Sequence, residues 1–311
     1  KGLASIGDTN FGFPEVVGPD GISFQGGGLY IIMAESTKGL GNPTNPGANQ
    51  FGQLLKATLP SGQFQATADV GNFNFDWTNL NKNKPFAPPG QFPDANPYGV
   101  LALPGHQYVV DAGANTLNEV DSNGSTQKIL AYFPNPPVSD AVPTCVAQGS
   151  DKSLYVGTLG SLVPGQAKVY KVNPNVPGIQ YLDSSNEWAT GFSSITGCGF
   201  GPRGFYVTEF GSADVPGDVK QIAINPDGTA GTITQLIGSL QNPNGFAVGP
   251  DGAIYVSNKS ISSGGGEVVR ITAVPEPSSP LSLLPLGTLG AASTLKRKLK
   301  LSKSTARKSQ K

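Results

Sequence analysis

The sequence contains very few of the residues on which imidazole and thiol chemistry depend. Its 311 residues include one histidine, two cysteines and one methionine. With a single histidine, zinc ligation and imidazole-based acid–base catalysis are both disfavoured. That histidine, His106, lies in a Pro-Gly-His-Gln segment typical of an exposed hairpin turn. Two cysteines are also too few to hold together a disulfide-rich scaffold.

The sequence has no overall excess of charge of either sign. It contains 21 Lys and Arg against 21 Asp and Glu, but eight of the basic residues lie in 296–311. Residues 1–273 alone carry a net charge of about −7. Nucleic-acid binding requires clustered Lys and Arg against the phosphates. No nucleic-acid partner is therefore expected.

Long stretches with helical spacing of apolar residues are also missing, whereas glycine (42) and proline (27) are abundant. Residues 242–257 instead predict two short strands joined by a Gly-Pro-Asp-Gly turn. Four similar segments precede them, and a tyrosine in each second strand is separated from the next by 78, 47, 51 and 49 residues. These tyrosines are Tyr30, Tyr108, Tyr155, Tyr206 and Tyr255.

This period leaves room for four short antiparallel strands, and such a sheet has to be covered on both faces by its neighbours. The sequence therefore predicts an all-β chain, a β-propeller over residues 1–272 with about five blades visible, followed by a short hydrophobic and basic tail over 273–311. The chain opens on lysine and its only methionine is Met33. We therefore expect an N-terminally truncated chain, with about six blades and any signal peptide in the complete protein.

Two further features of the repeats carry predictions. Cys145 and Cys198 lie near the starts of first strands in adjacent repeats, one register position apart. That offset predicts side chains on opposite sheet faces, which favours two small buried thiols over a disulfide. Residues 71–95 form an insertion that explains the longest step and predict a long loop. Its aromatic residues are expected to pack outside the propeller rather than cap the channel: Phe73, Phe75, Trp77, Phe86 and Phe92.

Two positions per repeat predict a polar ring at one end of the channel, because the first strand starts where the second strand ends. The first position is the predicted ligand-binding set: Asp20, Tyr98, Thr144, Thr196 and Asn244. The second position includes Thr158 and the predicted metal ligands Glu35, Asp111, Glu209 and Asn258. Carboxylate and amide oxygens of this kind suit Ca²⁺, the one cofactor that the sequence suggests. The alternative is that these polar residues serve the turns at the strand ends.

The repeat around Asp111, Asn115 and 117–120 resembles NHL-type propeller repeats. The ordered segments Gly-Ile-Ser-Phe (21–24), Phe-Gly-Gln-Leu-Leu (51–55) and Val-Asp-Ala-Gly-Ala-Asn (110–115) further resemble the ScyD/ScyE propellers, whose members are encoded in cyanobacterial gene clusters for scytonemin. The resemblance implies a role in extracellular pigment biosynthesis and an aromatic small molecule as ligand.

The C-terminal residues resemble a PEP-CTERM sorting signal, which implies an exosortase partner. The signal begins with Val274, Pro275, Glu276 and Pro277, and ends with Lys296, Arg297 and Lys298. Between them, residues 277–295 are uncharged and close to the roughly 20 residues that span a bilayer, so they would enter the membrane transiently. The basic residues should stay cytoplasmic, which would place the propeller outside the membrane.

The leading functional hypothesis is therefore an exported ligand-binding or scaffolding module of the cell envelope or extracellular matrix of a bacterium. An alternative is a hydrolase or lyase that depends on a divalent cation held by the carboxylates. A third possibility is adhesion to extracellular matrix proteins, which needs no polar pocket. No catalytic residue is assigned.

Overall fold

The computed structural model describes residues 2–8, 15–87, 93–124, 126–133, 140–212, 214–262 and 264–272. Residues 1–272 form one compact unit. The predicted sorting signal, Val274–Pro277 and Lys296–Lys298, lies outside the described residues. Among the described residues, no helix is long and apolar enough to cross a membrane.

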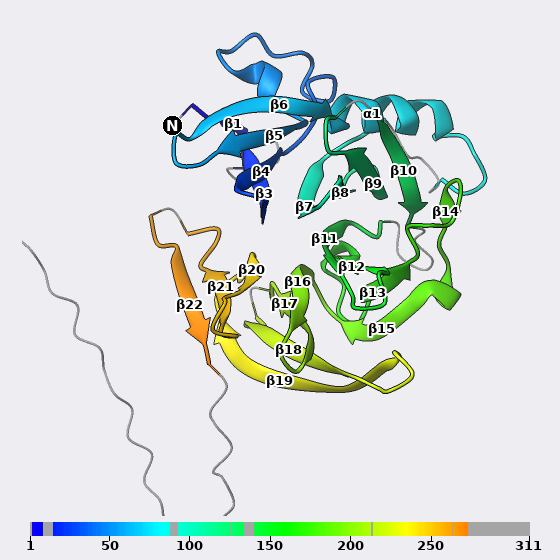
Figure 1. The fold of residues 1–311 in the computed structure, drawn as a ribbon, viewed down its shortest axis with the longest axis vertical. Helices are drawn as coiled ribbons and strands as arrows, with labels where there is room; N and C mark the ends of the chain where they lie inside the picture. The colour runs from blue at the N-terminus through cyan, green and yellow to red at the C-terminus, as the bar shows by residue number, and fades with distance from the viewer. Residues whose placement is uncertain are drawn as a thin grey trace, which may run out of the picture. The chain divides into compact units, whose positions relative to one another are not determined.

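Five antiparallel sheets follow one another along the chain, and their first strands surround a common centre (Figure 1). Blade 1 consists of β3 (Pro19–Gln25), β4 (Gly28–Met33), β5 (Gln53–Thr58) and β6 (Gln63–Asp69). Blade 2 consists of β7 (Pro97–Leu103), β8 (His106–Asp111), β9 (Thr116–Asp121) and β10 (Gln127–Tyr132). Blade 3 consists of β11 (Pro143–Gln148), β12 (Leu154–Thr158), β13 (Ala167–Val172) and β15 (Glu187–Phe192).

Blade 4 consists of β16 (Ile195–Gly201), β17 (Gly204–Glu209), β18 (Gly217–Ile224) and β19 (Ala230–Leu240). Blade 5 has three strands, β20 (Phe246–Val248), β21 (Ile254–Asn258) and β22 (Glu267–Ile271). The prediction of an all-β propeller with five visible blades is confirmed. Two small elements were not predicted: the short sheet of β1 (Ile6–Asp8) with β2 (Glu15–Val17), and β14 (Gln180–Tyr181), which adds a parallel strand to β10.

The repeated tyrosine packs each of the first four blades against the next one. Tyr155 meets Phe200 of blade 4 edge-on, with ring centroids 5.0 Å apart, and Tyr206 stacks on Phe246 of blade 5 at 6.0 Å. Tyr30 and Tyr108 belong to apolar clusters that continue into blades 2 and 3. All four are at most 5% exposed. The repeated tyrosine therefore packs between consecutive blades and covers the sheet face that one blade alone would leave exposed.

A glycine next to the channel brings the first strands of neighbouring blades into contact. A Cβ on Gly21, Gly99 or Gly197 would lie 2.5–2.6 Å from a carbonyl oxygen of the next blade's first strand. Real Cβ atoms do not approach a backbone oxygen this closely, so only glycine fits. The equivalent residue of blade 5, Gly245, has a side-chain atom at 3.4 Å as its nearest neighbour.

Gly197 lies against the next blade and Gly245 does not, so alanine substitutions at these two positions can be compared. Gly197→Ala is expected to lower the free energy of unfolding by about 1–3 kcal/mol, because the added methyl group forces two strands apart. Gly245→Ala should change it little, since the nearest atom to an added Cβ, Ser257 Oγ, would lie at a contact distance of 3.4 Å. Urea denaturation of both variants tests the pair. Equal losses in the two variants would contradict the close approach at Gly197.

In blade 3 this glycine is replaced by Cys145, which forms a disulfide with Cys198 of blade 4 at a Cα–Cα distance of 5.7 Å. The preference for two free thiols was wrong. The two side chains do leave opposite faces of their own sheets, as the register predicts. Because adjacent blades stack face to face, however, one face of each sheet packs against the opposite face of the next sheet. Opposite faces of neighbouring blades therefore meet at the same interface.

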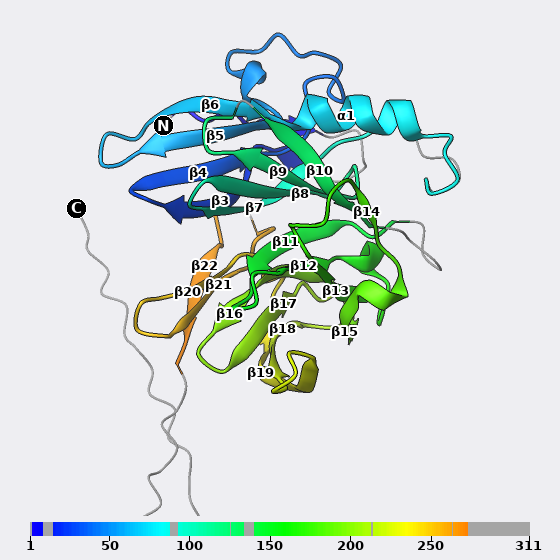
Figure 2. The same cartoon turned by 45° about the vertical axis from the view of Figure 1, so that its right-hand side comes forward.

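The insertion contains a helix where the sequence predicted a loop. Helix α1 (Val70–Asn81) begins at Asp69, whose side chain accepts a hydrogen bond from the backbone N–H of Asn72 at 3.0 Å. It lies along blades 1 and 2 near β10 (Figure 2). The rings of Trp77 and Phe86 lie 5.5 and 5.3 Å from that of Tyr132, the last residue of β10. These aromatic residues pack outside the propeller as predicted, while Phe92 lies outside the described residues.

Candidate functional site

A cavity of about 390 Å³ is lined by the first strands of all five blades. All five predicted ligand-binding residues contribute to it: Asp20, Tyr98, Thr144, Thr196 and Asn244. Each stands at or just before the beginning of its blade's first strand, so the repeat places the five at the same height around the channel. The structure therefore brings the whole first set together.

Tyr98 and Asn244 join two non-adjacent blades across this cavity. The Tyr98 hydroxyl donates a hydrogen bond to Asn244 Oδ1 at 3.0 Å, which links blade 2 to blade 5. Burial, reinforced by the negative charge of Asp20, raises the pKa of Tyr98 to about 12. The phenol therefore stays protonated and remains a hydrogen-bond donor at any physiological pH.

The two threonines of the set tie neighbouring blades together. The Thr144 hydroxyl donates to the carbonyl oxygen of Ile195 at 2.6 Å, and the Thr196 hydroxyl donates to that of Pro243 at 3.0 Å. Both side chains are buried. Since each hydroxyl proton is already used by the next blade, the threonines form the wall of the cavity. Asp20, Tyr98, Asn244 and Ser257 are left as its polar side chains.

The second predicted set does not line this cavity. Instead, its buried members hold the segment that leads into their own blade. Asp111 Oδ1 accepts from the backbone N–H of Asn96 at 2.7 Å, and Asn258 Oδ1 accepts from that of Gln241 at 2.8 Å. Glu209 accepts from the N–H of Ser193 in the same way, at 2.5 Å. This position is therefore a loop clamp that recurs in at least three blades.

Asp111 is the most constrained of these residues. It is fully buried, and its carboxylate also accepts from the N–H of Ala114 at 2.8 Å and from Asn74 Nδ2 at 2.7 Å. Burial raises the pKa of Asp111 to about 7, although the three hydrogen bonds act in the opposite direction. Asn74 comes from α1, so the helix of the insertion completes the environment of this carboxylate.

The remaining members of the second set also have local partners. Thr158 exchanges hydrogen bonds with the backbone of Lys168, and the backbone N–H of Glu35 donates to Asn96 Oδ1 at 3.2 Å. Within the described part of the chain, no three His, Cys, Asp or Glu side chains converge as metal ligands would. This geometry favours the turn interpretation of Asp111, Glu209 and Asn258, whereas for Glu35 it concerns the backbone alone. Ca²⁺ binding there stays a prediction.

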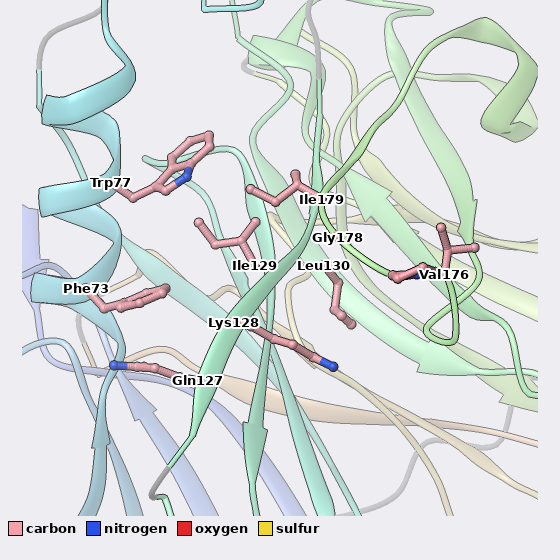
Figure 3. Close-up of a pocket in the computed structure, with 10 residues that line it drawn as sticks. Phe73, Trp77, Gln127, Lys128, Ile129, Leu130, Val176, Gly178 and Ile179 are labelled. Atoms are coloured by element: carbon pink, nitrogen blue, oxygen red, sulfur yellow. The ribbon is translucent and has the colours of Figure 1, made fainter.

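A second hollow lies on the outside of blade 2 and was not predicted. It measures about 340 Å³ and lies between α1, β10 and the loop 176–179 (Figure 3). Phe73 and Trp77 face it from the helix, Ile129 faces it from β10, and Ile179 faces it from the loop. The one charged side chain among the described residues of its lining is that of Lys128, which pairs with Glu119 at 3.0 Å. The sequence could not indicate this hollow because the predicted loop gave the aromatic residues no fixed face.

Comparisons with known proteins support the fold. No family model matches the sequence, and no curated protein matches it. A gluconolactonase from Xanthomonas campestris superimposes with a TM-score of 0.52 at 13% identity, covering 83% of this chain and 76% of its own. An aldose sugar dehydrogenase from Streptomyces coelicolor, in its PQQ-bound form, gives 0.47 at 16% identity over 77% and 74%. The calcium-binding protein regucalcin from Agrobacterium tumefaciens gives 0.47 at 13% identity over 77% and 67%. At 13% identity the gluconolactonase comparison shows the fold alone, and it agrees with the five-bladed β-propeller that the sheets of this chain form.

Proposed function

We propose that the protein is an exported ligand-binding module whose central cavity takes a small aromatic molecule carrying a positive charge or hydrogen-bond donors. One observation carries the proposal: among the described residues that line the cavity, Asp20 is the only one with a charged side chain. A cation or a donor group in the cavity would therefore gain from its field.

The rest of the lining suits an apolar ring. Ile22, Val100, Val146 and Phe246 contribute apolar surface beside the polar groups of Tyr98 and Asn244. Polar groups in a lining orient a ligand, while the apolar surface beside them adds affinity. An aromatic amine or phenol fits this division. The resemblance to ScyD/ScyE propellers, which implies an aromatic pigment precursor, supports the same class.

The protonation state of Tyr98 and the residue types in the cavity lining favour binding over catalysis. Tyr98 stays protonated up to about pH 12 and so cannot serve as a general base near neutrality. The lining also contains no histidine, and its two cysteines are joined in the disulfide. The cation-dependent enzyme therefore remains the second candidate. Matrix adhesion is a third candidate, with no observation in its favour.

Export is supported by the Cys145–Cys198 disulfide. Disulfides persist in oxidising compartments and are rare in the bacterial cytosol. The proposal therefore retains sorting by an exosortase, transient insertion of residues 277–295 into the membrane, and release to the cell envelope or extracellular space. A cytoplasmic protein that keeps its tail to Lys311 in its native host would contradict it.

The proposal predicts a charge-dependent affinity for aromatic amines. Asp20→Asn should weaken tryptamine binding about threefold to tenfold, because it removes a partly solvent-screened carboxylate while keeping the shape. Binding of uncharged indole should be unaffected. Isothermal titration with both probes, with and without Ca²⁺, measures the difference.

The control is Asp227→Asn in the exposed turn between β18 and β19, which should leave both affinities unchanged. Equal tryptamine affinity in Asp20→Asn and the unsubstituted protein would contradict a cavity that selects positive charge. No binding of either probe would contradict the proposed ligand class. A new product mass that appears only with Ca²⁺ would favour the enzyme instead.

A further inference from the structure

The hollow between α1, β10 and the loop 176–179 lies against the edge of a strand, not against a sheet face. Four consecutive residues of β10 line it, from Gln127 to Leu130. Side chains of consecutive strand residues point to opposite faces of a sheet. A hollow that touches both kinds of side chain therefore lies at the edge of the sheet. Its floor is the outer edge of β10, the edge turned away from β9.

Strand β14 covers only part of this edge. It pairs in parallel with the last two residues of β10, Ala131 and Tyr132. The loop 176–179, which precedes β14 in the chain, is not paired with β10. At Leu130 a side chain takes the place of a strand, because Gln180 Nε2 lies 3.5 Å from the carbonyl oxygen, the outer limit of a hydrogen bond. The edge along 127–130 therefore has no neighbouring strand within the described residues.

The register of β9 and β10 shows which backbone groups face the hollow. The carbonyl oxygen of Thr126 accepts from the N–H of Asp121 at 3.0 Å, so Thr126 turns towards β9. The direction of the backbone groups alternates along an antiparallel pair, and this register is regular up to Ile129. Gln127 and Ile129 therefore turn their N–H and C=O groups outwards. In the described part of the chain these four groups have no hydrogen bond to another element. Such a row is a template for a further strand.

Apolar side chains flank this edge on both sides (Figure 3). Phe73 and Trp77, both half-buried, stand on the side of α1, and Val176, which is 40% exposed, stands on the side of the loop. Side chains of a strand added at the edge would point alternately to the helix and to the loop. The ammonium group of Lys128 is already paired with Glu119. Both walls therefore favour apolar side chains.

We propose that the free edge of β10 binds an extended, apolar peptide segment of a partner protein, which adds a strand in line with β14. The backbone groups of Gln127 and Ile129 hydrogen-bond the peptide, and the two walls select its side chains. The four residues 127–130 correspond to about 13 Å of strand, so a segment of about four or five residues fills the site. Strand β14 shows that this edge accepts a strand from elsewhere, because it belongs to a connection within blade 3. The site is separate from the central cavity and does not depend on the proposed ligand.

The test uses the full chain and a phage library of random octapeptides as the probe. Selected peptides are synthesised, and their affinities are measured by fluorescence anisotropy. Peptides rich in apolar residues should bind Val176→Asp at least tenfold more weakly than the unsubstituted protein, because the new charge stands in the wall of the site. Val163→Asp is the matched control, since Val163 is also 40% exposed but does not line the hollow. It should leave the affinity unchanged. Both variants should unfold at the urea concentration of the unsubstituted protein.

Two further measurements separate strand addition from a simple apolar contact. Methylating the backbone nitrogens of the peptide one at a time should weaken binding at least tenfold at every second residue, where the N–H faces β10, and little at the others. Hydrogen exchange of the Gln127 and Ile129 amides should slow in the complex.

Three outcomes would overturn the proposal. The first is that no selected peptide is sensitive to Val176→Asp. The second is that methylation is tolerated at every position, or that exchange at Gln127 and Ile129 does not change. The third is that the apolar dye anilinonaphthalene sulfonate binds in a manner sensitive to Val176→Asp while no peptide does, which would make the hollow a site for small molecules.

Discussion

Replacing Cys145 and Cys198 together by alanine is expected to lower the free energy of unfolding by about 4 kcal/mol. The disulfide joins residues 53 positions apart, so in the unfolded chain it closes a long loop and removes much of its conformational freedom. It also joins blade 3 to blade 4 beside the cavity. The loss should therefore appear both in overall stability and in the integrity of the channel wall. Urea denaturation with and without reductant measures it.

The reductant supplies the control for this prediction. The unsubstituted protein should unfold at the same urea concentration as the double variant once its disulfide is reduced, while the variant should not respond to reductant. Equal stability of the oxidised protein and the variant would show that the disulfide does not contribute. A loss in the variant that reduction fails to reproduce would trace the effect to packing around Cys145.

Replacing Asp111 by alanine should cost about 3–5 kcal/mol of unfolding free energy. Its carboxylate accepts hydrogen bonds from the N–H groups of Asn96 and Ala114 and from the side chain of Asn74. A buried donor that loses its acceptor costs about 1–3 kcal/mol, and here three donors lose theirs at once. Urea denaturation at pH 5 measures the loss, and Asp227→Ala in an exposed turn is the matched control with little expected change.

The same residue predicts a pH dependence. Burial raises the pKa of Asp111 from 3.8 to about 7, so between these pH values the folded state holds a proton that the unfolded state has released. Stability is therefore fully present below about pH 4 and falls as the pH rises towards 7, by up to about 1.4 kcal/mol per pH unit. Asp111→Asn should flatten this slope. An unchanged slope in that variant would assign the dependence to other groups.

The hydrogen bonds of Asp111 and Glu209 make these residues poor probes of metal binding or catalysis. Substituting Asp111 and Glu209 together would remove two loop clamps, so a loss of activity could not be separated from a loss of structure. Asp20 and Tyr98 are better probes of function. Their side chains line the cavity and belong to none of these clamps.

The sequence alone determined the architecture and one ring of residues. A repeat of about 50 residues, rich in Gly and Pro and marked by a tyrosine, predicts stacked four-stranded sheets because each sheet needs neighbours on both faces. Once the blades are radial, equivalent positions must lie at equal heights. The placement of Asp20, Tyr98, Thr144, Thr196 and Asn244 around one cavity follows from that symmetry.

Tertiary structure decided everything that depends on contacts between different blades. The disulfide could not be predicted from register within single sheets, because Cys145 and Cys198 meet across an interface between two of them. Helix α1 required its packing against blade 2, which supplies the contacts of Trp77 and Asn74. Only burial, a property of the assembled ring, separates Tyr255 from the four tyrosines before it.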